Sequence, residues 1–247
     1  LYQSKIMKIF PAIDIKDKKC VRLVKGKFKN KKVYDVTPLD QAKKYNDFGF
    51  NYIHVVDLDG ALSGETINLD IIEEIVKKLN IKIEVGGGIR SLEKLQKYID
   101  IGVDKAIIGT AAVKDKQFLK EACDKFNNQI ALGLDAKNGL VTISGWQEET
   151  KLNTLNFLSD INHYGLSRLI YTDINRDGTK TSPNLKETIK VAEISKAPVI
   201  VSGGVSSIKD IEDIKNVTYK NIEGVIVGKA IYDGDINLKE LSGFLNA

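Results

Sequence analysis

Cysteine and histidine are scarce in this sequence. Cys20 and Cys123 are the two cysteines, far apart and in no CxxC pattern, and the two histidines, His54 and His163, are isolated. Disulfide frameworks and zinc sites need clusters of these residues at short spacing. The sequence therefore predicts neither, and a reducing cytoplasm is the expected location. We interpret both histidines as structural residues, and we expect no metal and no cofactor.

Long apolar runs and concentrated basic blocks are also missing. No stretch approaches the roughly 20 apolar residues of a membrane-spanning helix, and no signal-peptide pattern is present. The 247 residues carry a formal net charge of +4, with lysines scattered among acids, which does not indicate nucleic-acid binding. We expect a monomer with neither a membrane nor a nucleic-acid partner. Residues 1–6 resemble a remnant of an expression vector before a native start at Met7, which leaves 7–247 as one domain.

Short β-branched apolar runs alternate with amphipathic segments along the chain. This alternation is typical of parallel strands buried on both faces and connected by helices. Strands are predicted at 8–14, 52–57, 81–85, 105–109, 130–135, 168–172, 198–202 and 224–228. Helices are predicted at 69–79, 92–101, 118–126, 152–164 and 185–194. Eight strand–helix units without a linker predict an α/β fold, a single (β/α)8 barrel, rather than two domains.

The second half of the sequence repeats the first. Equivalent residues recur in the same order, 116 to 121 positions apart: Gly87 and Gly203, Asp57 and Asp173, Gly109 and Gly228, and Asp14 and Asp135. Such a repeat predicts two duplicated half-barrels of four strands each. Residues four strands apart face each other across the axis of a barrel.

Glycine-rich turns before helices form the first candidate site. Glycine lets backbone N–H groups approach an anion closely, and a helix N-terminus adds partial positive charge. The loops after strands seven and eight often bind phosphate in such barrels. We therefore predict a first phosphate grip, made of Gly87, Gly88, Arg90, Gly109 and Thr110, and a second, made of Gly203, Gly204, Gly228 and Lys229. The alternative is that these glycines only form tight turns. Two opposed grips predict an elongated substrate with a phosphate at each end.

Two aspartates end apolar strands at equivalent positions of the two halves. An unpaired acid would be costly in the core, so we expect Asp14 and Asp135 to be exposed at the active face. Opposed carboxylates can act as general base and general acid when their surroundings separate their pKa values. The alternative is that either aspartate caps the loop that follows it.

Polar loops supply further candidates. Thr172 is placed to hydrogen-bond a substrate, and Asp177 is either a second acid or a turn residue before Gly178. Trp146 is either a core residue or one that stacks on a planar ligand. Residues 15–37 are expected to fold as a hairpin or lid, and their excess of lysine either covers an anionic ligand or forms a solvated face.

The motifs around these residues together resemble the ProFAR isomerase family of histidine biosynthesis. They are Pro11-Ala12-Ile13-Asp14, Val21-Arg22-Leu23 with Lys25-Gly26, Val56-Asp57-Leu58-Asp59-Gly60-Ala61, Gly86-Gly87-Gly88-Ile89-Arg90, Gly145-Trp146, and Thr172-Asp173-Ile174 with Arg176-Asp177-Gly178-Thr179. The resemblance covers about residues 9–231. It implies a cofactor-independent, Amadori-type isomerisation of the aminoaldose ProFAR, which carries two phosphates, to the aminoketose PRFAR. By this resemblance Asp14 is the base that takes the C2 proton and Asp135 the acid that helps to open the ribose ring. The residues that it assigns to substrate binding are Arg22, Trp146, Thr172 and Asp177.

Other functions are compatible with the same pattern. The cyclase subunit of imidazole glycerol phosphate synthase has the same two aspartates and would use ammonia, but Arg22-Leu23, Gly145-Trp146 and residues 57–60 fit the isomerase better. A dual isomerase that also acts on phosphoribosyl anthranilate is a second alternative. A non-catalytic phosphosugar-binding barrel is a third, against which the two strand-end aspartates argue.

Overall fold

The computed structural model describes residues 6–24 and 27–245. Residues 1–5, most of the segment interpreted as a vector remnant, lie outside the described residues, as do Lys25 and Gly26 of the expected hairpin.

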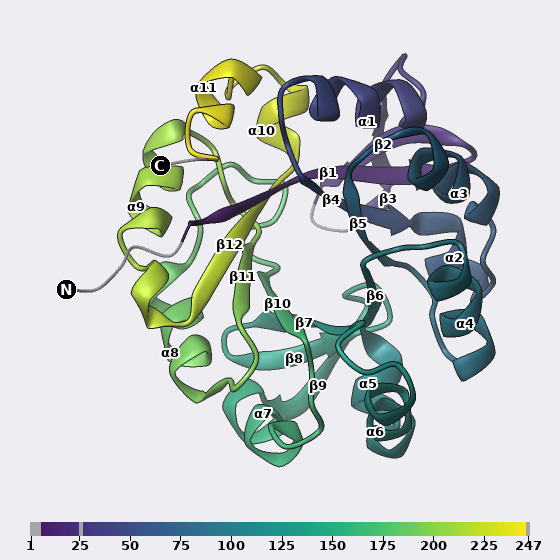
Figure 1. The fold of residues 1–247 in the computed structure, drawn as a ribbon. Coiled ribbons are helices and arrows are strands. Elements are labelled where there is room, and N and C mark those ends of the chain that lie inside the picture. Colours follow the sequence, from purple (N-terminus) through teal and green to yellow (C-terminus); the bar gives the residue numbers. More distant parts are fainter. Residues whose placement is uncertain (1–5, 25–26, 246–247) are drawn as a thin grey trace.

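Eight parallel strands form a closed barrel (Figure 1). In order around it they are β1 (Lys8–Lys16), β4 (Tyr52–Asp57), β5 (Lys82–Gly86), β6 (Lys105–Ile108), β7 (Ile130–Lys137), β10 (Arg168–Asp173), β11 (Val199–Ser202) and β12 (Ile222–Val227). The pairing of β12 with β1 and of β7 with β10 closes the ring. The expected (β/α)8 fold is confirmed, and each predicted strand agrees with the structure to within two residues at either end.

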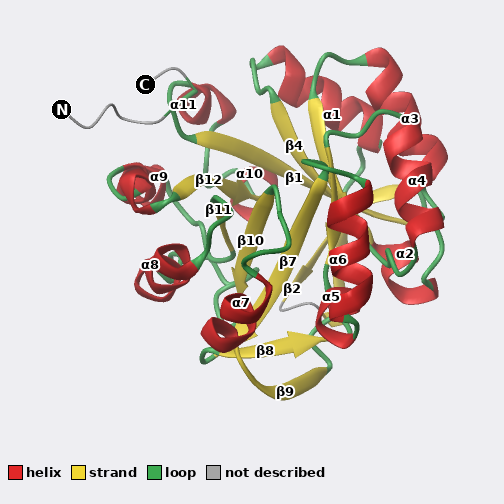
Figure 2. Cartoon of the chain, turned by 60° about the horizontal axis from the view of Figure 1, so that its bottom comes forward, coloured by secondary structure: helices red, strands yellow, loops and turns green. Residues whose placement is uncertain are grey.

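Helices surround the barrel (Figures 1 and 2). They are α1 (Pro38–Asp47), α2 (Leu58–Ser63), α3 (Leu69–Lys78), α4 (Leu92–Asp100), α5 (Thr110–Lys114), α6 (Lys116–Lys125), α7 (Thr154–Ile161), α8 (Leu185–Ile194), α9 (Ile208–Lys215), the 3-10 helix η1 (Thr218–Lys220), α10 (Lys229–Tyr232) and α11 (Leu238–Ser242). The five predicted helices are all present. Among the described residues, no helix is both long enough and apolar enough to cross a membrane.

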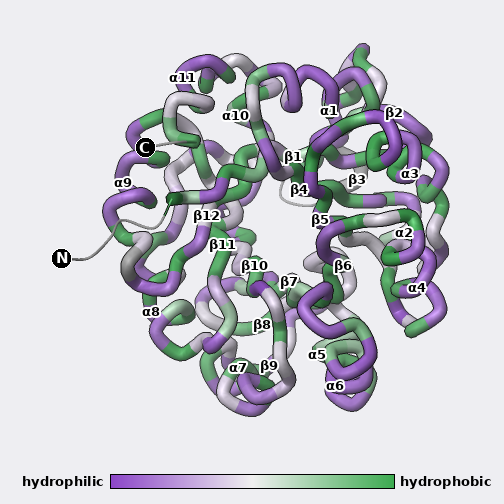
Figure 3. The backbone as a smooth tube through the Cα atoms, in the orientation of Figure 1, coloured by the Kyte–Doolittle hydropathy of each residue, from purple (hydrophilic) through white to green (hydrophobic). Residues whose placement is uncertain are grey.

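Apolar side chains fill two layers. One lies between the strands and the helices, and Figure 3 shows hydrophobic strands inside a ring of helices with hydrophilic outer faces. The other fills the barrel interior with every second residue of the strands, as parallel strands require: Phe10, Ala12, Ile107, Ala131, Ile170, Ile200 and Ile226. The interior is therefore a packed core, and open space remains only at one end of it.

An antiparallel hairpin follows the first strand of each half-barrel. β2 (Lys19–Val24) and β3 (Lys27–Val33) follow β1, and β8 (Leu140–Ile143) and β9 (Glu148–Asn153) follow β7. Asp14 pairs with Val21 and Asp135 pairs with Thr142, so each aspartate faces the residue seven positions later. Figure 2 shows β8 and β9 beyond the end of β7. The hairpin expected within residues 15–37 is present, whereas β8 and β9 replace a segment for which the sequence predicted only a loop.

Equivalent side chains lock the loops of the two halves. Asn68 donates to Asp57 at 2.7 Å, and Asn184 donates to Asp173 at 2.6 Å. Each pair ties the end of a barrel strand to the N-cap residue of a helix, α3 or α8, and each asparagine follows its aspartate by eleven residues. The duplication inferred from motifs therefore extends to hydrogen bonds that hold the strand ends in place.

Helix α9 begins with a reciprocal capping box. The Ser207 side chain accepts from the Asp210 N–H, and the Asp210 carboxylate accepts from the Ser207 N–H at 3.1 Å and from the Ser206 N–H and hydroxyl at 2.7 Å each. Such caps satisfy backbone donors that the helix leaves unpaired. Burial alone would raise the pKa of Asp210, but the bonds from Ser206, Ser182 and the backbone outweigh burial and lower it.

We expect Asp210→Ala to lower the free energy of unfolding by about 2 kcal/mol at pH 7, because buried donors lose their acceptor. A carboxylate with a lowered pKa stabilises above its unfolded value, so the loss should shrink as the pH falls through the folded pKa of Asp210. Urea denaturation at pH 7 and pH 3 measures this. Asp213→Ala, which removes an exposed partner of Lys209 on the same helix, should stay within about 0.5 kcal/mol. Equal losses for the two variants would contradict the capping argument.

Candidate active site

A cavity of about 870 Å³ opens at the carboxyl ends of the barrel strands. All the residues proposed from the sequence line it: Asp14, Arg22, Gly87, Gly88, Arg90, Gly109, Thr110, Asp135, Trp146, Thr172, Asp177, Gly203, Gly204, Gly228 and Lys229. Barrel closure brings them together, although they span most of the chain. We call this cavity the mouth.

Asp14 lies on β1 in a buried ion pair. Its Oδ2 atom is 3.0 Å from Nη1 of Arg22 on β2, and both side chains are about nine-tenths buried. The expectation that Asp14 is exposed is therefore wrong, because the hairpin brings a cation that compensates the buried charge. Burial alone would lower the pKa of Arg22, but Asp14 and Asp177 outweigh it and raise the pKa.

The Arg22 guanidinium also reaches the second phosphate grip. A side chain at Gly228 would place its Cβ 2.3 Å from Nη2 of Arg22, so this glycine leaves the room that the guanidinium occupies. The Nε atom of Arg22 is buried and has no hydrogen-bond partner. A buried cation with an unused donor at a phosphate grip suits a site that receives an anion.

Asp135 on β7 has neutral partners. The indole Nε1 of Trp146 donates to its Oδ2 at 2.8 Å, and Thr172 is its neighbour on β10. Burial raises the pKa of Asp135, and hydrogen bonds from Trp146 and Thr172 oppose the increase. Trp146 therefore lies in the site, bonded to an acid, rather than in the core, and its stacking on a ligand stays a prediction.

Asp177 adds a third acid. Burial raises its pKa to about 6; Arg22 opposes this shift, whereas the negative charges of Asp14 and Asp135 add to it. The Asp177 N–H donates to the Asp173 carbonyl at 3.1 Å, so its loop is anchored to the end of β10. A carboxyl with a pKa near neutrality can both give and take a proton at physiological pH.

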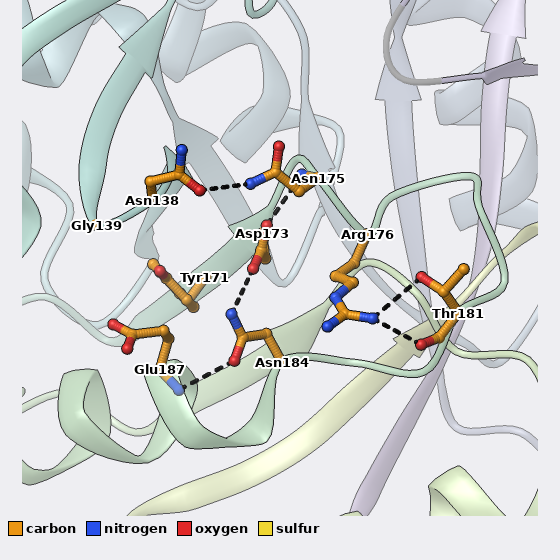
Figure 4. Close-up of a pocket in the computed structure, with 9 residues that line it drawn as sticks. All are labelled: Asn138, Gly139, Tyr171, Asp173, Asn175, Arg176, Thr181, Asn184 and Glu187. Atoms are coloured by element: carbon orange, nitrogen blue, oxygen red, sulfur yellow. Dashed lines mark hydrogen bonds between the residues drawn. The ribbon is translucent and has the colours of Figure 1, made fainter.

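A second pocket, of about 600 Å³, lies beside this loop (Figure 4). Its polar side chains bond one another: Asn175 donates to Asn138 at 3.0 Å, and Arg176 donates to the Thr181 carbonyl at 2.9 Å. With the Asp173–Asn184 bond these contacts fix residues 173–184, which carry Asp177. We interpret this pocket as the support of the loop rather than a ligand site.

The phosphate grips have the same construction in both halves. A Cβ at Gly88 would lie 1.8 Å from the Gly60 carbonyl, and one at Gly204 would lie 2.6 Å from the Ser182 carbonyl. Tight turns therefore account for part of the glycine pattern, as the alternative interpretation holds. Gly109 and Gly228 precede α5 and α10 with nearly equal backbone angles, φ −105° and ψ −109° against φ −115° and ψ −96°.

Polar side chains of the grips already have protein partners. Arg90 donates to the Ala61 carbonyl at 3.1 Å, and Lys229 donates to the Gly178 carbonyl at 3.3 Å. The Thr110 hydroxyl accepts from the Ser144 N–H at 2.9 Å, which ties the Trp146 hairpin to the first grip. Phosphate contact by these residues remains a prediction.

Lys180 and His54 are among the mouth-lining residues that were not sequence-based candidates. Lys180 lines the cavity with Lys229 and pairs with Asp235 at 2.6 Å. Its sequence position follows a recognised motif, but nothing distinguished it from the other lysines. His54 lines the mouth as well, two residues before Val56 on the inward face of β4, and strand alternation could have identified it. Among the described residues, no group of three or more His, Cys, Asp or Glu side chains is arranged to hold a metal ion.

Comparison with known proteins gives consistent matches over nearly the whole chain. A family model described as "Histidine biosynthesis protein" matches residues 8–237. A protein of Pelagibacter ubique (strain HTCC1062), named 1-(5-phosphoribosyl)-5-((5-phosphoribosylamino)methylideneamino) imidazole-4-carboxamide isomerase, is 66% identical over 241 residues, which cover 98% of this chain and 100% of the relative. Proteins with the same name from Clostridium botulinum (strain Hall) and Oceanobacillus iheyensis are 46% and 42% identical; they cover 97% and 95% of this chain and 98% and 97% of their own lengths.

Asp177→Asn changes the free energy of unfolding by an amount that depends on pH. We expect this change to be about 2 kcal/mol more stabilising at pH 7 than at pH 4. The pKa of Asp177 in the folded state, about 6, lies above its ordinary value of 3.8. Well below the ordinary value the carboxyl is protonated in both states, so the difference between wild type and variant should no longer change with pH. As the pH rises towards 6 the unfolded state ionises first, so the wild type loses stability that the neutral amide keeps. Urea denaturation across this range measures the difference, and a pH-independent difference would contradict the assignment.

Proposed function

The chain belongs to the histidine biosynthesis protein family, and from this premise we propose that Asp14 and Asp135 isomerise the bisphosphorylated aminoaldose ProFAR to the aminoketose PRFAR. The activity is that of an aldose–ketose isomerase, the class for which the relatives are named. The observation that carries the residue assignment is the contrast between the two acids: Asp14 faces a cation, and Asp135, which is half-buried, accepts a hydrogen bond from the neutral Trp146 indole.

Asp14 acts as the base. Its Oδ2 atom, 3.0 Å from Nη1 of Arg22, accepts the C2 proton of the opened sugar. Asp135 acts as the acid, since burial raises its pKa and favours a proton that it can give to the ring oxygen of the ribose. Ring opening leaves an imine at C1, loss of the C2 proton gives an enolamine, and ketonisation at C2 with a proton added at C1 gives the aminoketose.

The phosphate grips hold the two ends of the substrate. They lie after barrel strands on opposite sides of the mouth, and the ribose that reacts is suspended between Asp14 and Asp135. Thr172 and Asp177 contact the sugar, and Arg22 and Trp146 bind the substrate from the two hairpins. Holding the reacting atoms in place lowers the entropic part of the barrier, and a bisphosphorylated substrate offers the binding energy for it.

The working state of the protein is a cytoplasmic monomer that needs neither a cofactor nor a nucleic-acid partner. The two cysteines are free and buried, which suits a reducing compartment. Elution at the mass of one chain, about 27.4 kDa, in size-exclusion chromatography is the expected result.

Asp14→Asn should lower kcat by at least about a hundredfold, because general base catalysis is worth roughly 10²–10⁴ and the rearrangement cannot bypass this proton. Substrate affinity should change little, since the phosphate grips are intact. The purified enzyme is assayed with ProFAR, with ammonia plus the aminoketose, and with phosphoribosyl anthranilate in parallel. Near-normal kcat in the variant would overturn the base assignment, and wild-type turnover only with ammonia would favour the cyclase.

The two equivalent glycines that precede α5 and α10 give a matched test of the second grip. Gly228→Ala would place its Cβ 2.3 Å from the Arg22 guanidinium, whereas the nearest contact for Gly109→Ala is 3.7 Å. Because the backbone conformations match, backbone strain cancels in the comparison. We expect Gly228→Ala to displace Arg22 from Asp14 and to lower kcat/KM at least about tenfold more than Gly109→Ala does. Equal kinetic effects would count against the link between Arg22 and Asp14.

A further inference from the structure

His54 lines the mouth, and the mechanism above leaves it unused. It is on β4, between Ala12 of β1 and Glu84 of β5 in the strand register. Its neighbour Ala12 is small and also lines the mouth, and the His54 side chain keeps 14% exposure. His54 is thus an imidazole in the same cavity as Asp14 and Asp135.

One ring nitrogen of His54 already has a hydrogen-bond partner. Nδ1 lies 2.8 Å from Oε1 of Glu84, and the other oxygen of Glu84 accepts from Nη1 of Arg168 at 2.8 Å. A carboxylate only accepts hydrogen bonds, so Nδ1 must carry the proton. In the neutral ring Nε2 then has a free lone pair. It is the ring nitrogen that can accept a hydrogen bond from a ligand in the mouth.

Burying the charged groups of this network costs desolvation free energy. Glu84 and Arg168 are 1% and 3% exposed, and Arg168 also donates to Glu223 at 3.0 Å, which pairs with Lys8. Apolar residues of similar volume often stabilise a core as well as a buried ion pair does or better. A network that holds Glu84 against His54 inside an otherwise apolar barrel therefore points to a requirement for a fixed imidazole.

We propose that His54 is a substrate-contacting residue, whose Nε2 atom accepts a hydrogen bond from a hydroxyl of the ribose held between Asp14 and Asp135. Glu84 and Arg168 are positioning residues, because they act through His54. The proposal rests on the proposed function, which supplies the sugar. A hydroxyl is the donor that the chemistry requires, since the phosphates lie at the two grips and Nε2 of a neutral imidazole can only accept.

Acidic side chains approach the His54 imidazole from several elements of the barrel. Glu84 faces it from β5, and Asp135 and Asp177 are close enough to interact with it from β7 and from the loop after β10. The alternative is a core histidine whose role is limited to donating a hydrogen bond to Glu84. The two roles use different ring nitrogens, so amide substitutions can separate them.

His54→Asn keeps a donor near the Nδ1 position for Glu84 but leaves nothing at the Nε2 position, whereas His54→Gln places its amide near Nε2. With ProFAR as substrate, we expect His54→Asn to lower kcat/KM at least about tenfold, the loss for one good hydrogen bond, and His54→Gln to keep several times more activity than His54→Asn. Urea denaturation checks that both variants fold. A wild-type kcat/KM in folded His54→Asn would overturn the proposal.

A second pair tests the positioning role. Glu84→Gln and Glu223→Gln each remove one carboxylate from Arg168, but only Glu84 contacts His54. Long-range ¹H–¹⁵N spectra report the tautomer directly, and with two histidines in the chain the His54 variants assign the signals. We expect the Nδ1–H tautomer in the wild type and in Glu223→Gln, a mixture in Glu84→Gln, and reduced kcat/KM only in Glu84→Gln. Identical tautomers and kinetics in the two variants would contradict the positioning role. A wild type that does not turn over ProFAR would contradict the proposed function instead, and the spectra would still test the Glu84 contact.

Discussion

Closure of the parallel sheet is the constraint on which the rest of the structure depends. The pairing of β12 with β1 and of β7 with β10 leaves no free edge in the barrel, so all eight carboxyl ends meet around one mouth. Asp14 and Asp135 lie on strands four apart and therefore face each other across it. Backbone hydrogen bonds fix that separation, so the two acids need no flexible loop to bring them into position.

Duplication supplied two similar halves, and the chemistry depends on where they differ. Arg22 follows the residue paired with Asp14, and the equivalent position after the partner of Asp135 is Ile143. One carboxyl therefore has a cation beside it, and the other accepts from a tryptophan N–H. Two acids with the same backbone setting thus lie in different electrostatic surroundings, which suits the base and the acid proposed for this site.

The sequence was informative wherever a pattern is local or repeated. Apolar alternation located all eight strands, and the repeat of glycine turns and strand-end aspartates located the mouth. It was uninformative about pairs formed across the fold. The exposure expected for Asp14 was wrong because the Arg22 partner depends on the register of β2 on β1, and strand β9, with alternating exposed and half-buried residues such as Glu149 and Thr150, has no apolar pattern to reveal it. Lys180 and His54 were missed because one lysine resembles another in a sequence, and because a single inward histidine resembles a core residue until its neighbours are known to be small.

The glycines of the grips show why the two interpretations of a glycine-rich turn need not exclude each other. Gly88 meets the Gly60 carbonyl and Gly204 meets the Ser182 carbonyl so closely that any Cβ would separate the loops that follow adjacent strands. The close approach is a packing requirement, and it holds without a ligand. The same turns precede α4 and α9, and a helix N-terminus favours an anion. A packing requirement and the proposed binding role therefore select the same residue, and a grip that is already fixed by packing would lose little entropy on binding the phosphate that we propose for it.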